Sequence, residues 1–327
     1  MEFRKLEKLV NYCRPSQRRL KAILDGELSL LRGQERIQNR DGFLYSPGSH
    51  PVLLVAHLDT VHQQAPSAFY IDKTRSADGD LWCEEGIGGD DRCGVLIVME
   101  LIKELDCHVL FTEDEEAGGQ GAIKFSRSGI RPDVQYIVEF DRQGCDDAVF
   151  YNCDNPGFTE FVEDYGFIES TGTFSDISYI APALGIAAVN LSSGYYHAHT
   201  RQEFIRLADV ESIIERAARL ILNVETRYEY IERDDYDWHW EQEMRMGDWR
   251  HSGRCGDVRC AWCDEAVGDT ITSDYCQFCY SELSVLCDLC GDGELLSDCI
   301  IFGSGVYCRN CLERPARTSR RFRFNGS

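Results

Sequence analysis

Apolar positions along the first two thirds of the chain follow two alternating patterns. Short apolar runs, typical of strands buried on both faces of a sheet, occur at 51–55, 108–112, 135–140 and 187–191. Helical spacing is found over about 30 residues at the start, with a break at Pro15, and at 95–105, 121–126, 177–181 and 210–224. Strands that alternate with helices predict an α/β domain whose mostly parallel sheet is sandwiched between helices.

Composition divides the chain into four segments. We expect a first domain over 1–227, an acidic and aromatic connector over 228–254, a cysteine-rich domain over 255–313 and a basic, disordered tail over 314–327. The connector contains three of the five tryptophans. A flexible linker would not carry them, so we expect the connector to pack on a neighbouring domain.

The chain is strongly acidic, with 56 Asp+Glu against 34 Lys+Arg and a formal net charge of −22. Such a surface repels phosphates and anionic lipids, so general binding to nucleic acid or membranes is not expected. Residues 1–10 lack the apolar core and cleavage site of a signal peptide. We therefore expect a soluble cytoplasmic protein, in which clustered cysteines favour zinc over disulfides.

Ten of the 16 cysteines lie between Cys255 and Cys311, and eight of these form four C-x2-C pairs. This spacing predicts two structural zinc sites of the zinc-ribbon or treble-clef type, because four thiolates leave zinc no open position. The predicted ligands are Cys260, Cys263, Cys276, Cys279, Cys287, Cys290, Cys308 and Cys311. Sequential or interleaved pairing stays open, as do the roles of Cys255 and Cys299. We expect this module to recognise a protein partner.

Five segments rich in His, Asp and Glu follow predicted strands or a glycine turn, where ligands bind in open α/β sheets. They are AHLDTV (56–61), GIGGDDRCG (86–94), TEDEEAGG (112–119), VEFDRQG (138–144) and YYHAHTRQE (195–203). Carboxylates gathered at one edge repel each other unless a cation lies among them. Mixed imidazole and carboxylate groups suit zinc or a related divalent ion, and the surplus of carboxylates permits two metals that share one Asp.

The order of these motifs is specific. AHLDTV, GIGGDDRCG, TEDEEAGG, the strand-terminal Asp141, GTFSD and HTRQE occur as they do in the dizinc exopeptidases. Over about residues 40–225 the chain resembles this family of aminopeptidases and carboxypeptidase-G-like enzymes, which includes tripeptide aminopeptidase and related deacylases. The resemblance implies the zinc exopeptidase fold. Only about 30 residues separate Asp141 from Gly172, so the lid domain of part of the family is absent.

By position, the resemblance implies two catalytic zincs that share a bridging Asp90. The other implied ligands are His57 and Asp141 for the first zinc, and Glu116 and His199 for the second. Glu115 is implied as the general base. Asp59, two residues after His57 on an extended segment, can hydrogen-bond the ring nitrogen that does not bind metal. Asp176 in GTFSD matches a position near the site, and Glu203 follows His199 by four, as the family pattern requires.

Several assignments stay open. Glu139 shares a strand face with Asp141 and is an alternative ligand, and His197 is an alternative to His199. His197, Tyr195 or Tyr196 is a candidate to stabilise the oxyanion, since no lid supplies that group.

The activity that the resemblance implies is hydrolysis of an amide bond in a short peptide or acyl-amino-acid substrate, with an aminopeptidase as the first expectation. An N-acyl amino acid deacylase or a carboxypeptidase is the alternative within the family. A second hypothesis belongs to another functional class: a binding or regulatory protein whose first domain is catalytically inactive and whose zinc module binds a partner. The complete set of implied ligands argues against that reading.

Overall fold

The computed structural model describes residues 1, 3–62, 64–74, 79–224 and 226–233, together with the backbone of four short strands between 284 and 308. The chain divides into two units, Met1–Arg245 and Met246–Ser327. Among the described helices, none has the length and apolar character that crossing a bilayer requires.

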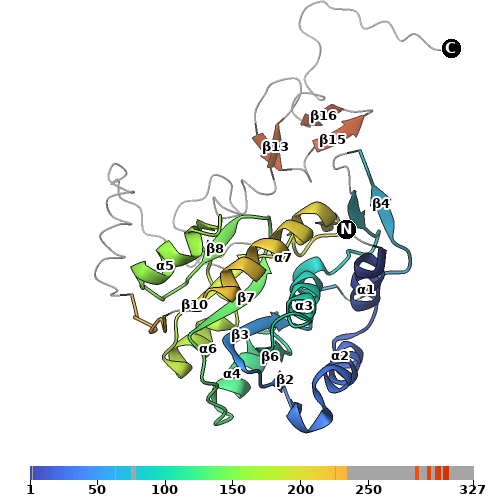
Figure 1. Ribbon diagram of the computed structural model, residues 1–327. Helices are drawn as coiled ribbons and strands as arrows, with labels where there is room; N and C mark the ends of the chain where they lie inside the picture. Colours follow the sequence, from blue (N-terminus) through green and yellow to red (C-terminus); the bar gives the residue numbers. More distant parts are fainter. Residues whose placement is uncertain are drawn as a thin grey trace, which may run out of the picture. The chain divides into compact units, whose positions relative to one another are not determined.

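An eight-stranded sheet forms the centre of the first unit (Figure 1). Its strands in spatial order are β1 (Gln38–Arg40), β2 (Phe43–Ser46), β6 (Cys107–Thr112), β3 (His50–His57), β7 (Tyr136–Arg142), β10 (Ala188–Ser192), β8 (Asp147–Val149) and β9 (Ile168–Glu169). The four central strands, β6, β3, β7 and β10, are parallel and correspond to the apolar runs of the sequence. β1 and β2 pair antiparallel with their neighbours, and β8 pairs antiparallel with β10 but parallel with β9. The predicted fold class is confirmed.

Helices cover both faces of this sheet (Figure 1). On one face lie α1 (Phe3–Cys13), α2 (Gln17–Arg32), α3 (Gly89–Leu101), α5 (Pro156–Glu163) and α7 (Leu207–Leu222); on the other lie α4 (Gln120–Ser126) and α6 (Ile177–Leu184). Successive side chains of β3 point to opposite faces, so Leu54 packs in the first core cluster whereas Leu53 and Val55 pack in the second. A short 3-10 helix (Gln34–Arg36) follows α2.

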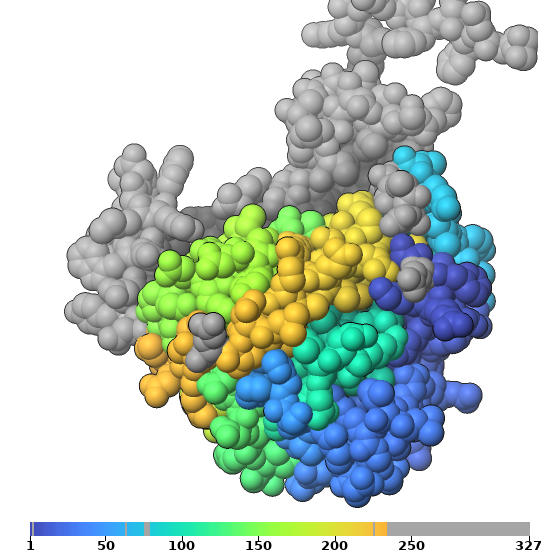
Figure 2. All heavy atoms as spheres, viewed as in Figure 1, coloured from blue at the N-terminus to red at the C-terminus, as the bar shows by residue number. Residues whose placement is uncertain are grey.

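Helix α3 is buried along its whole length, all 13 residues included. It packs between the sheet and the layer formed by α1 and α7. Figure 2 shows α7 as a yellow-to-orange band across this face, next to the dark blue atoms of α1, and there Lys5 Nζ donates to Glu211 Oε2 at 2.9 Å. The predicted helix over 95–105 corresponds to α3. Asp90 and Asp91, in the glycine-rich turn, have non-helical backbone angles, so the regular helix starts three residues before 95. The Asp90–Asp91 peptide bond is cis.

A second, four-stranded antiparallel sheet was not predicted. It contains β11 (Tyr195–Tyr196), β12 (Phe204–Arg206), β5 (Asp80–Trp82) and β4 (Tyr70–Asp72), in that order. Its strands have two or three residues, too few to show a period of two. The pairing of β5 with β12 joins the segment that precedes Asp90 to the segment that follows His199, and this brings two of the sequence motifs together.

The chain stays on the first unit beyond the expected boundary at Arg227. Glu229 forms a β-bridge with Ile186, and Glu232 forms one with Cys153. The start of the acidic connector therefore packs on the first domain.

In the second unit, β13 (Ser284–Leu286) pairs with β14 (Gly293–Leu295), and β15 (Cys299–Phe302) pairs with β16 (Gly305–Cys308). Both hairpins are antiparallel, and the register places Cys299 opposite Cys308. The other seven predicted cysteine ligands lie outside the described residues.

Candidate metal centre

The five polar segments meet at one edge of the large sheet. His57 is the last residue of β3, Asp141 is the penultimate residue of β7, and residues 113–116 directly follow β6. These parallel strands are neighbours, so their carboxyl ends lie at the same edge. Asp90, at the start of α3, and His199, in the turn between β11 and β12, reach this edge from outside the large sheet.

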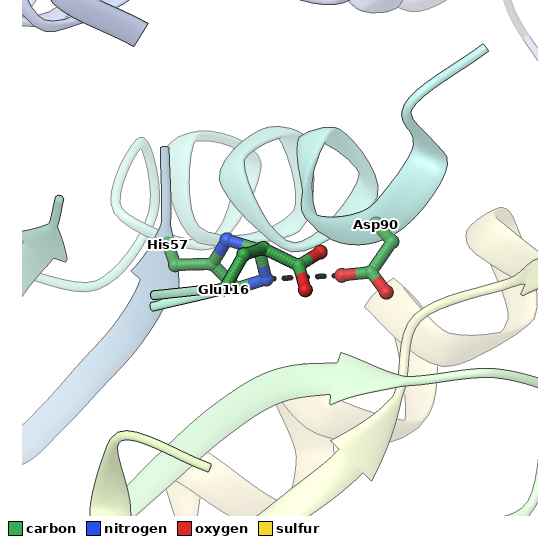
Figure 3. A group of neighbouring side chains, drawn as sticks. All are labelled: His57, Asp90 and Glu116. Carbon is green, nitrogen blue, oxygen red and sulfur yellow. Dashed lines mark hydrogen bonds and ion pairs between the residues drawn. The ribbon is translucent and has the colours of Figure 1, made fainter. Parts of the chain in front are cut away.

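His57 is surrounded by three carboxylates. Its Nε2 lies 2.9 Å from Asp90 Oδ1 and 3.3 Å from Asp141 Oδ1, and its Nδ1 lies 3.2 Å from Asp59 Oδ1. The ring is completely buried. Figure 3 shows the ring and the carboxyl groups of Asp90 and Glu116 pointing toward one another. Asp59 thus contacts the ring nitrogen opposite the one that faces Asp90.

His199 forms a second group around the same aspartate. Its Nε2 lies 3.2 Å from Asp90 Oδ2 and 3.2 Å from Glu116 Oε1. Asp90 therefore directs one carboxylate oxygen at each imidazole. The donor atoms of His57, Asp90 and Glu116 lie within 4.8 Å of one another. All five predicted metal ligands are thus brought together, in two groups that share Asp90.

A pair of cations would satisfy the imidazole and carboxylate groups of this site better than hydrogen bonds alone do. His57 Nε2 carries at most one proton but faces two carboxylates, and His199 Nε2 does the same. Glu116 Oε1 is buried, and apart from the ion-pair contact with His199 Nε2 it accepts no hydrogen bond. A divalent cation accepts several carboxylate and imidazole ligands at once, so it would satisfy all of these groups.

Asp91 belongs to the same region but is already occupied by backbone donors. Its Oδ2 accepts from His57 N–H at 3.2 Å, and its Oδ1 accepts from Gly94 N–H at 2.9 Å. It holds the end of β3 against the first turn of α3, and Asp90 is left to face the imidazoles.

Burial sets the electrostatics of the site. It raises the pKa of Glu115 to about 10, with added repulsion from Asp141 and Asp176. It also raises the pKa of Asp141 to about 7. The contacts with Asp90 and Glu116 raise the pKa of His199 to about 11. A cation at this edge of the sheet would favour the ionised form of these carboxylates.

Asp59 also fixes the segment after β6. Its Oδ1 accepts from Glu115 N–H and its Oδ2 accepts from Glu116 N–H, both at 3.0 Å. The same carboxylate thus orients the His57 ring and the backbone of two further site residues. Glu115 and Glu116 are adjacent, so their side chains diverge, and only Glu116 contacts His199.

Glu203 holds the backbone of Asp90 through a hydrogen bond. It is fully buried, its Oε1 accepts from Asp90 N–H at 2.9 Å and its Oε2 accepts from Gly88 N–H at 2.9 Å. His62 Nε2 lies 2.6 Å from Glu203 Oε2. The sequence marked Glu203 only by its distance from His199 and gave no sign of His62, because both act through contacts with residues far away in the chain.

Asp141 and Glu139, the two candidates for the same metal-ligand position, have different contacts in the structure. Asp141 contacts His57, whereas Glu139 is fully buried and accepts a 2.5 Å hydrogen bond from Ser175 Oγ. The Ser175 hydroxyl also lies 3.1 Å from Asp141 Oδ2. Asp176 lies under the site, where it accepts a hydrogen bond from Thr112.

The candidates for the oxyanion role lie in different directions. Tyr195 is buried and its hydroxyl lies 3.5 Å from Asp141 Oδ1, whereas the Tyr196 hydroxyl donates to Asp209. Adjacent strand residues point to opposite faces, so only Tyr195 faces the site. The exposed ring of His197 packs 5.6 Å from that of Phe204. The described contacts bring neither Tyr196 nor His197 to the His57 group.

No protein-family model and no curated protein matches this chain. Solved structures do. Aminopeptidase PepT from Bacillus cereus is similar with a TM-score of 0.51 and 15% identity, over 65% of this chain and 95% of that chain. A tripeptidase from Staphylococcus aureus is similar with a TM-score of 0.52 and 13% identity, over 65% and 95%. At this identity the likeness is one of fold, and it agrees with the fold predicted from the sequence.

Proposed function

We propose that this protein is a dizinc peptidase that removes residues from the amino terminus of short peptides. The observation that carries the proposal is Asp90, whose two oxygens face His57 and His199 at 2.9 and 3.2 Å. One carboxylate shared between two imidazole-containing groups is the arrangement that a pair of metal ions requires. The two similar solved structures are of an aminopeptidase and a tripeptidase, which supports peptides as the substrate class.

In this proposal His57, Asp90 and Asp141 hold the first ion, and Asp90, Glu116 and His199 hold the second. When bound, such ions lower the pKa of water and polarise a carbonyl oxygen. Glu115 is next to a ligand but contacts neither imidazole in the described structure. It accepts the proton of the attacking water and returns it to the nitrogen of the leaving amine. Asp59 keeps the His57 ring and the Glu115 backbone in fixed positions relative to each other during this proton transfer.

For the second unit we propose two structural zincs held by the four C-x2-C pairs, with a protein partner. The spacing of the cysteines supports this. The full chain would then bind about four zincs, two of them needed for hydrolysis.

The test compares the zinc-loaded full chain with Glu115→Gln on a mixed panel of short peptides and acyl amino acids. We expect release of amino-terminal residues by the wild type and a loss of about a thousandfold or more in Glu115→Gln, because proton transfer is lost while zinc content is kept. Glu160→Gln, an exposed glutamate on α5, is the matched control and should keep full activity. If the zinc-loaded wild type cuts neither substrate class, the proposed function is wrong.

A further inference from the structure

Helix α2 contacts the segment that carries Glu115 through two side chains, Gln17 and Lys21, which lie one helical turn apart. Gln17 Nε2 donates to Asp114 Oδ1 at 2.8 Å, and Asp114 N–H donates to Gln17 Oε1 at 2.9 Å. Lys21 Nζ donates to the Glu113 carboxylate. Both partners directly precede Glu115, so α2 is attached to the candidate general base by way of its two neighbours.

The backbone at Asp114 needs such support. Its φ is +59°, the left-handed conformation that side chains other than glycine rarely adopt. The Gln17 amide accepts the Asp114 N–H and donates to the Asp114 side chain, so it stabilises this conformation from two directions. The turn made here directs the next two N–H groups toward Asp59.

Glu113 is fixed by a separate set of contacts. Lys21 is 8% exposed, and its ammonium also donates to the Arg40 carbonyl at 2.6 Å. Gly42 N–H donates to Glu113 Oε2 at 3.0 Å, and Glu113 N–H donates to the Gly42 carbonyl at 2.9 Å. The start of the segment is therefore attached to α2 and to the β1–β2 turn, while Asp59 holds its far end.

We propose that Gln17 and Lys21 are positioning residues for Glu115. Asp59 fixes the N–H groups of Glu115 and Glu116, and the Glu113 and Asp114 carbonyls accept from Gly121 N–H and Gln120 N–H at 2.8 and 3.1 Å. None of these bonds holds the Asp114 N–H or the side chains of Glu113 and Asp114 on the side that faces α2. Gln17 and Lys21 supply the contacts on the α2 side, and through them they set the distance between the Glu115 carboxylate and the reacting water. The catalytic meaning of this distance rests on the proposed function.

The first variant is Gln17→Ala in the zinc-loaded full chain. Misplacement of a catalytic group lowers the rate more than it lowers substrate binding, so kcat should fall about tenfold or more while KM changes less than about twofold. Arg18→Ala is the matched control, because Arg18 is exposed on the same turn of α2; its kcat should equal that of the wild type. Lys21→Met should show a smaller loss, since Gly42 N–H still holds Glu113.

Asp114→Gly separates positioning from general stabilisation. Glycine adopts a φ of +59° without strain, so adding Asp114→Gly to Gln17→Ala should restore kcat by about threefold or more. A fall in thermal stability with kcat and KM unchanged in Gln17→Ala would show that the contact serves the fold alone, and would overturn the proposal.

Amide hydrogen exchange gives a readout that does not depend on catalysis. In Gln17→Ala the Glu115 and Glu116 N–H groups should exchange about tenfold faster than in Arg18→Ala, because their segment is free to tilt. If the wild type cuts no substrate and this change is still seen, the proposed function fails while the positioning of the segment stands. If exchange and kcat in both Gln17→Ala and Lys21→Met equal those of Arg18→Ala, the proposal is overturned.

Discussion

The two histidines that face Asp90 have very different surroundings. His57 ends a central strand, is fully buried and has a carboxylate at each ring nitrogen. His199 lies in the turn between β11 and β12, where its backbone φ is +62° and its side chain is 46% exposed. One half of the site is thus part of the core, and the other half is a surface loop brought to it.

Because of this difference, the His57 half and the His199 half of the site are stabilised in different ways. Removing His57 leaves Asp59, Asp90 and Asp141 close together inside the protein, so its loss affects the fold. The His199 loop is tied down by the β5–β12 pairing and by Glu203, which binds the backbone on either side of Gly89. The position of His199 therefore depends little on its own ring. We expect the first half to be needed for folding and the second half for metal binding alone.

The largest expected effect is the contrast between His57→Ala and His199→Ala in the metal-free protein. His57→Ala should lower the free energy of unfolding by about 3 kcal/mol, because it leaves buried carboxylates without their partner. His199→Ala should cost about 1 kcal/mol or less, because a half-exposed ion pair contributes little. Urea unfolding with a chelator present measures both. Equal losses in the two variants would contradict the contrast between core and loop.

A smaller effect concerns His108 on β6, a buried histidine away from the site. Its Nδ1 lies 2.8 Å from the Tyr45 hydroxyl. Burial, together with the nearby Arg32 guanidinium, lowers the pKa of His108 to about 4. His57 is more deeply buried, yet its carboxylate partners hold its pKa well above the usual value. In the metal-free protein, neighbouring charge rather than depth therefore sets the direction in which each histidine's pKa is shifted.

The sign of the pH effect follows from the His108 value. Between pH about 6.5 and about 4, the unfolded chain binds a proton at His108 that the folded chain does not, so stability falls as the pH falls through this window. His108→Gln retains an acceptor for Tyr45 but does not titrate. Urea unfolding at several pH values should show a shallower decline for His108→Gln than for the wild type. Parallel curves would show that the His108 pKa is not lowered in the folded state.

The sequence predicted the parts of this fold that depend on local pattern. The central strands and the helices α1, α2 and α7 follow from apolar periodicity. The position of the candidate metal centre follows from the rule that parallel strands end at one edge. The small antiparallel sheet was missed because its strands are too short to show a period. The edge strands β1, β2, β8 and β9 were missed for a related reason, since they also have only two to four residues.

The five proposed metal ligands came from motif order, and the structure brings all of them together. The supporting residues were not predictable in the same way. Gln17 and Asp114 are 97 positions apart, and His62 and Glu203 are 141 apart. Such pairs form only when the helices and sheets have packed, so no local pattern marks them. Tyr195 and Tyr196 could not be distinguished until β11 showed which face each occupies.

The central claim is that Asp90 is shared by two metal ions. The most direct measurement is X-ray diffraction from zinc-containing crystals of the full chain, with data collected on both sides of the zinc absorption edge. We predict two anomalous peaks flanking the Asp90 carboxylate, about 3.5–4 Å apart, one beside His57 and Asp141 and the other beside His199 and Glu116. A single peak at this edge of the sheet, or peaks that do not contact Asp90, would contradict the account.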